Sequence, residues 1–180
     1  MTSQLRVPAA KSRPLCNTTN LLNKIYYIPR EGGSELIPYL LSGDLKTAAG
    51  STLVIKKDLI KEVGYFDEDF ERRQDIEFLV RVLKQSSLVY VDKVLMERHN
   101  SPTPSAEDFK SADMKLLQKF SDDVIQSEIN GYSIISRRHA SLAKLYCRDG
   151  HIRKSIVHIT RAKKTPINLL GIFLAVIRGL

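Results

Sequence analysis

The stretch AAGSTLVIKKDLIKEVGYFDEDFERRQDIEFLVRVL, residues 48–83, carries most of the information about the fold. Its β-branched run predicts a strand over residues 51–55. A short helix is expected to begin at Asp58 and to end before Gly64. An acidic and aromatic turn over residues 65–70 follows, because Gly, Asp and Phe here fit neither helical nor strand periodicity.

A second helix is predicted to begin near Asp75. Its apolar residues recur at the spacing of one helical face, formed by Ile76, Leu79, Val80 and Leu83. Asp75 is therefore expected in the first helical turn, beside a loop. Two interpretations of this carboxylate are open: a cap that accepts hydrogen bonds from free helix amides, or a general base that points into a cleft.

The block resembles the middle of a family-2 glycosyltransferase, a family with the A-type, Rossmann-like fold. The resemblance depends on four elements in the family's order and spacing, which are more specific together than any one alone. They are Ala49-Gly50-Ser51, then Gly64-Tyr65-Phe66-Asp67-Glu68-Asp69-Phe70, then Gln74-Asp75, then Glu77-Phe78-Leu79 with Arg81.

The resemblance implies transfer of a sugar from a nucleotide-sugar donor to a hydroxyl of a carbohydrate or lipid-linked acceptor, as in polysaccharide biosynthesis. Asp75 would be the general base of an inverting reaction. The family places further residues near the donor or acceptor, and here they are Lys46, Thr47, Gly50, Ser51 and Gln74. Gly50 lacks a side chain and would let backbone amides approach a phosphate, although a glycine that eases the entry to a strand explains it equally well.

The family also implies Mg²⁺ or Mn²⁺ bound to the donor diphosphate. His99 matches the position of a histidine that completes the metal site, and a solvated loop histidine is the alternative. Asp67 and Asp69 form an Asp-x-Asp pattern, but they follow a helix rather than a buried strand. We therefore expect Asp67 to brace the turn through its backbone rather than to bind a metal.

The predicted fold class is α/β: a partial A-type (Rossmann-like) glycosyltransferase core, followed by an α-helical tail with a tetratricopeptide-like hairpin. The resemblance covers an acceptor-side half, residues 24–104, preceded by an extended or disordered leader, residues 1–23. A whole A-type transferase is longer than 180 residues. A separate donor-binding half is therefore expected as a partner.

Further elements are predicted around this block. Strands are expected over residues 24–28, 87–91 and 94–98, the last two as a hairpin through Asp92-Lys93. A short helix is expected over residues 35–41, before Gly43.

The tail, residues 105–180, is predicted to be helical. A helix of about 25 residues should begin at a capping box of Ser105 and Asp108 and end at Asn130-Gly131. Two more helices, over residues 137–149 and 152–164, resemble one tetratricopeptide-type hairpin.

Charge and cysteine content restrict the setting. Residues 137–180 hold 10 Lys and Arg against one acidic residue, so the net charge of +8 belongs to the tail. Nucleic-acid binding is disfavoured, because Tyr146 and Phe173 are the only aromatic residues there. Cys16 and Cys147 suggest neither a disulfide nor a zinc site, so a cytoplasmic location is expected.

The last stretch, residues 166–180, is apolar but too short for a confident membrane span. It predicts either a buried terminal helix or an anchor on the inner membrane face. An alternative function follows: a catalytically inactive remnant, or a helical adaptor that binds a protein partner or a membrane surface.

Overall fold

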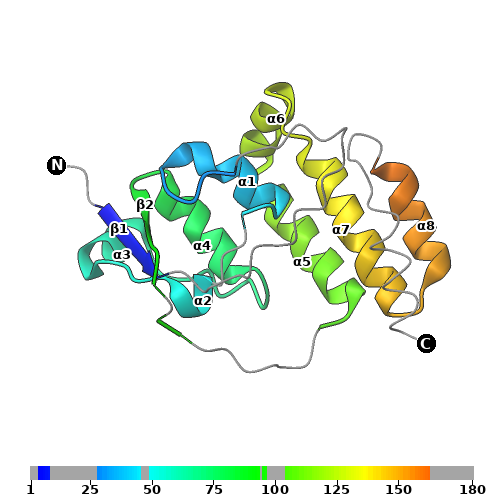
Figure 1. The fold of residues 1–180 in the computed structure, drawn as a ribbon, viewed down its shortest axis with the longest axis horizontal. Coiled ribbons are helices and arrows are strands. Elements are labelled where there is room, and N and C mark those ends of the chain that lie inside the picture. The colour runs from blue at the N-terminus through cyan, green and yellow to red at the C-terminus, as the bar shows by residue number, and fades with distance from the viewer. Residues whose placement is uncertain (1–3, 9–27, 46–48, 94, 97–103, 163–180) are drawn as a thin grey trace.

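The computed structural model describes residues 4–8, 28–45, 49–93, 95–96 and 104–162. Within these ranges the chain is mainly helical, with a pair of strands at one end and the α7 and α8 helices at the other (Figure 1). The elements are β1 (Gln4–Pro8), the 3-10 helix η1 (Ser34–Leu36), α1 (Ile37–Ser42), α2 (Ala49–Thr52), α3 (Lys57–Val63), α4 (Gln74–Leu83), β2 (Ser87–Val91), α5 (Ala106–Lys119), α6 (Ser121–Ile129), α7 (Ile134–Arg148) and α8 (Ile152–Arg161).

The predicted α/β fold class is wrong. A Rossmann-like core alternates several parallel strands with helices. In the described residues, the strands amount to a single parallel pair, β1 with β2, in which Gln4 lies opposite Ser87. Residues 51–55 do not form the predicted strand, because Ser51 and Thr52 belong to α2. Short β-branched runs are compatible with either state, and the tertiary surroundings select one.

The strand predicted over residues 87–91 is confirmed as β2, but its partner differs from the prediction. It pairs in parallel with β1, which comes from the predicted leader. Leu95 and Met96 are not in a strand, and the rest of residues 94–98 lies outside the described residues. The strand expected over residues 24–28 also lies outside them, apart from Ile28, which is not in a strand.

The helices of the central block agree with the predictions, except that residues 34–36, at the start of the helix predicted over residues 35–41, form the 3-10 helix η1. α3 ends at Gly64, whose φ of +88° favours glycine, and α1 ends at Gly43 with a φ of +81°. α4 buries the predicted face, with Ile76, Leu79, Val80 and Leu83 all inaccessible or nearly so.

The long helix predicted after Ser105 is divided into α5 and α6. Phe120 lies between them with φ −109° and ψ 37°, outside helical geometry, and its side chain is buried in the core. The predicted capping box is confirmed, because Ser105 Oγ accepts from the amide of Asp108 and the Asp108 carboxylate accepts from the amide of Ser105. Periodicity missed the break because the apolar stripe continues across it.

The helices α7 and α8 lie side by side as a hairpin (Figure 1). The turn between them includes Gly150 at φ +78°. Ser155 Oγ of α8 donates to the carbonyl of Ala143 of α7 at 2.8 Å in a buried position. None of the helices in the described ranges combines the length and the apolar character that crossing a membrane requires.

One hydrophobic cluster includes residues from both sides of position 105, the predicted start of the tail. It joins α1, α4 and β2 to α5, α6 and the start of α7. Its most enclosed members include Leu36, Leu41, Leu79, Leu116 and Ile134. The domain division at residues 24–104 and 105–180 remains a prediction, but the two segments share this core.

A buried ionic network reinforces the same junction. Arg138 of α7 is 4% exposed, donates to the carbonyls of Leu41 and Leu40 at 2.6 and 3.3 Å, and lies 3.1 Å from Asp113. Burial lowers the pKa of Arg138, against the opposite effect of Asp113. Arg73 reaches the same Asp113 oxygen at 2.8 Å. The network therefore connects the end of α1 and the start of α4 to α5 and α7.

Candidate functional site

The candidate site is the start of α4 and the turn before it. Asp75 is the second residue of α4 and is partly buried. Its Oδ1 accepts a hydrogen bond from the amide of Ile76 at 2.9 Å. Among the described residues, neither an ion pair nor a further hydrogen bond of this carboxylate is seen. Both interpretations of Asp75 therefore remain open, since one oxygen caps an amide and the other is available.

Arg73, just before α4, has the left-handed φ of +64°, which is uncommon for a residue with a side chain. Its guanidinium is fixed by the Asp113 ion pair and lies 5.2 Å from the centre of the Phe109 ring, within the range of a cation–π contact. Two contacts with α5 thus hold the backbone conformation that orients Gln74 and Asp75.

The turn over residues 64–70 is attached to α4 by Arg81. Its Nε and Nη2 donate to the two carboxylate oxygens of Glu77 at 2.7 and 2.9 Å. The same guanidinium donates to the carbonyls of Val63 and Tyr65 at 2.7 and 2.6 Å. Glu77 is fully buried, so this pair is charge-assisted and bidentate in a water-poor environment. The turn is therefore fixed relative to Asp75.

Asp67 has the structural role predicted for it. Its Oδ1 accepts from the amide of Asp69 at 3.0 Å, closing the turn, and its Oδ2 lies 2.6 Å from Lys119 Nζ. The hydrogen bond from Lys119 lowers the pKa of Asp67. Burial depresses the pKa of Lys119, but its bonds to Asp67 and Glu77 outweigh that effect and raise it. Both carboxylate oxygens of Asp67 thus have partners, one within the turn and one on α5.

The other predicted site residues fall in three places. Gln74 opens α4 and is exposed. Gly50 and Ser51 lie on α2, which packs against α4, and Ser51 is exposed. Thr47 and His99 lie outside the described residues. The structure therefore brings Gly50 and Ser51 onto an element next to the helix that carries Gln74 and Asp75.

The described residues bring together no ligand cluster for the Mg²⁺ or Mn²⁺ implied by the resemblance, and the predicted ligand His99 lies outside them. Such ions are held by several oxygen ligands. Across the part of the chain that the structure describes, no group of three or more His, Cys, Asp or Glu side chains could hold a metal ion. Asp67 is already bonded to Lys119.

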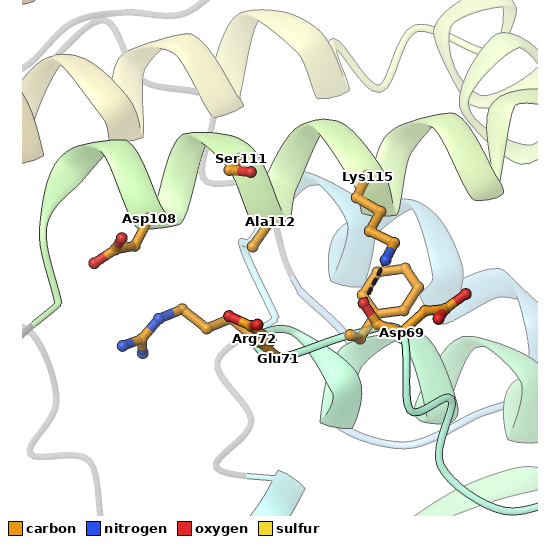
Figure 2. Close-up of a pocket in the computed structure, with 8 residues that line it drawn as sticks. Asp69, Glu71, Arg72, Asp108, Ser111, Ala112 and Lys115 are labelled. Atoms are coloured by element: carbon orange, nitrogen blue, oxygen red, sulfur yellow. Dashed lines mark hydrogen bonds between the residues drawn. The ribbon is translucent and has the colours of Figure 1, made fainter.

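A pocket of about 350 Å³ is lined by residues that come just before α4 in the sequence. One wall is the turn and the residues just after it, and the other wall is α5 (Figure 2). It is lined by Asp69, Phe70, Glu71, Arg72, Asp108, Ser111, Ala112 and Lys115. Asp75 is not among these residues, so the expectation that it points into a cleft is not met by this pocket.

The pocket is polar and of mixed charge. Lys115 donates to the carbonyl of Asp69 and lies 5.0 Å from the centre of the Phe70 ring (Figure 2). The side chains of Glu71, Arg72 and Ser111 have no hydrogen-bond or ion-pair partner among the described residues. The pocket therefore offers hydrogen-bond donors and acceptors together, which suits a polyhydroxylated ligand better than an apolar one.

Sequence reasoning missed the residues that hold the site together. The Glu77 and Arg81 pair has the i, i+4 spacing of a helical ion pair, so this contact had a visible signal. Lys119 lies 42 positions after Glu77 but reaches it at 2.8 Å. No local pattern indicates that contact.

Comparison of the chain with protein-family models, with curated proteins and with solved structures gave no match.

Proposed function

We propose that the chain is the acceptor-side part of an enzyme that transfers a sugar from a nucleotide-sugar donor to an acceptor hydroxyl. The observation that supports this proposal is the exposure and hydrogen bonding of the Asp75 carboxylate. Its carboxylate is partly exposed, has one oxygen free of protein partners in the described residues, and belongs to a helix anchored in the core. A donor-binding half would act as a separate partner.

The chemistry assigned to Asp75 is proton abstraction. A carboxylate oxygen accepts the proton of the acceptor hydroxyl, and the acceptor oxygen forms a bond to C1 of the sugar. The bond from C1 to the diphosphate breaks, and the nucleoside diphosphate leaves with that electron pair. Arg81 and Glu77 contribute only by holding the turn beside α4. The polar pocket supplies groups that can bond to sugar hydroxyls.

The test is an Asp75→Asn substitution, assayed after the chain is combined with a separate donor-binding half. Asparagine keeps the size of the side chain and its ability to accept from the Ile76 amide, but it is not a base. A positioned base contributes about 10² to 10⁴ in rate, so release of nucleoside diphosphate should fall by that factor.

The matched control is Asp122→Asn, because Asp122 is exposed, is the second residue of α6 as Asp75 is of α4, and does not line the pocket. This variant should keep transfer within a few fold. Thermal unfolding should be nearly unchanged in both variants. Near-normal transfer by Asp75→Asn, or a loss explained by unfolding, would show that Asp75 is not the base.

A catalytically inactive helical adaptor is the second candidate. The observation in its favour is that the described residues form helices around a single strand pair, without the sheet on which a donor nucleotide would bind. The two candidates differ in the reconstituted assay. Transfer that depends on Asp75 supports the enzyme, whereas absence of transfer with every uridine and guanosine diphosphate-sugar supports the adaptor.

A further inference from the structure

The outward face of α8 combines aliphatic and basic side chains. Ser155, His158 and Ala162 are buried and mark the side of the helix that faces the protein. Ile152, Ile156 and Val157 are 45%, 54% and 46% exposed, and they lie on the other side together with exposed Arg153 and Thr160. α8 contains no acidic residue. Its outward face is therefore amphipathic and cationic.

Two basic side chains of α8 form no ion pair within the described residues. Arg138 and Arg148 are used inside the fold, and Lys154 pairs with Glu107. By contrast, Arg153 and Arg161 are exposed, and neither side chain has a hydrogen-bond or ion-pair partner among the described residues. Their charge is available to a partner.

The α6 helix shows that exposed isoleucines alone do not define such a surface. Ile125 and Ile129 are 59% and 73% exposed, as much as the aliphatic residues of α8. Their helix carries Asp122, Asp123 and Glu128 and no basic residue. An anionic surface would repel α6 and attract α8.

We propose that the outward face of α8 docks onto an anionic lipid surface, with Ile152, Ile156 and Val157 entering the interface and Arg153 and Arg161 bonding to lipid phosphates. The cationic face of α8 is complementary in charge to an anionic lipid surface. Residues 137–180 carry 10 basic residues and one acidic residue, so a second copy of the chain would bring like charge to the same face. Interfacial helices combine this kind of apolar face with Lys and Arg at its edges. The inference is independent of the proposed sugar transfer.

The experiment is co-sedimentation of the full chain with vesicles of phosphatidylcholine and phosphatidylserine in equal parts, compared with phosphatidylcholine alone. Each Lys or Arg near an anionic surface adds about fivefold to partitioning, so Arg153→Glu should weaken binding about 25-fold. Ile156→Asp should weaken it about tenfold or more, because an aliphatic anchor is replaced by an anion.

Each control makes the same kind of substitution at an exposed position outside α8. Lys57→Glu alters the net charge as Arg153→Glu does, and Ile129→Asp introduces the same exposed aspartate on α6. Both controls should bind anionic vesicles nearly as the unaltered chain does. Circular dichroism should show all four variants folded, since all four side chains are exposed.

Three outcomes would overturn the proposal. The first is equal binding to both kinds of vesicle, and the second is equal loss in the α8 variants and their controls. The third is absence of vesicle binding together with self-association that Ile156→Asp abolishes, which would assign the face to a second copy. A selective loss of anionic-vesicle binding in Arg153→Glu and Ile156→Asp supports it.

Discussion

At the residue scale, the fully buried Glu77 is the most consequential charge near the candidate site. A buried carboxylate is stable only where its charge is paired and hydrogen-bonded. Arg81 supplies a bidentate partner, and Lys119 adds a second cation at 2.8 Å. Arg81 also serves the carbonyls of Val63 and Tyr65. The Arg81 guanidinium therefore neutralises the buried Glu77 carboxylate and also holds the turn through its carbonyls.

Replacing Arg81 with alanine should lower the free energy of unfolding by about 3 kcal/mol, since it removes one partner of a buried pair. Arg81→Lys should recover only part of this loss, because an ammonium cannot form the bidentate contact and reach the carbonyls together. Urea unfolding followed by circular dichroism measures both values. The control is Lys61→Ala, which breaks a solvent-exposed pair with Asp58 and should cost about 0.5 kcal/mol or less. A cost for Arg81→Ala as small as that of Lys61→Ala would contradict the assigned role.

At the element scale, the α7 and α8 hairpin contains a pair of histidines between its helices. The Nδ1 atoms of His139 and His158 lie 3.0 Å apart, so one ring donates to the other. The His158 ring also stacks on Tyr146 at a centroid distance of 5.1 Å. Burial lowers the pKa of both histidines below the ordinary value of 6.5, and Arg161 adds to the effect. Burial, with a hydrogen bond to Glu107, raises the pKa of Tyr146 to about 12.

The pair should make the hairpin sensitive to acid. Between the lowered pKa of the folded state and 6.5, the unfolded chain binds protons that the folded chain does not. Stability should therefore be complete above pH 6.5 and should fall as the pH decreases below it. Thermal unfolding at pH about 5.5 and about 7.5 measures this difference. His158→Gln should reduce the difference, whereas the exposed His151→Gln should keep it. An unchanged pH dependence in His158→Gln would rule out the pair as its source.

At the scale of the whole molecule, the shared cluster predicts one cooperative unit. Leu116 of α5 is fully buried and belongs to the same hydrophobic cluster as residues of α1 and α4, which precede the predicted tail. Loss of its side chain leaves a cavity in the centre of that cluster. This cavity should therefore destabilise elements on both sides of residue 105.

Leu116→Ala should lower the free energy of unfolding by about 2 to 5 kcal/mol. Hydrogen exchange should become faster in α4 as well as in α5, because both helices lose the same support. Met114→Ala, on the same helix at an exposed position, should change the stability by about 0.5 kcal/mol or less. Faster exchange confined to the helices after residue 105 would instead indicate two separately stable units.

The sequence by itself determined the local features of this protein. The α3 and α4 helices, the capping box at Ser105 and the ends at Gly64 and Gly131 follow from capping residues, glycine conformation and apolar spacing, all of which act within a few positions.

Tertiary structure alone decided the rest. The parallel pairing of β1 with β2 and the contact of Lys119 with Glu77 depend on partners far away in the chain. The helical state of Ser51 and Thr52 and the break at Phe120 also differ from what the local pattern predicts. A run of β-branched residues or a lone lysine has no preference strong enough to specify such a partner, so packing makes the choice. For the same reason the position of Asp75 in the first turn of α4 was predictable, whereas its surroundings were not.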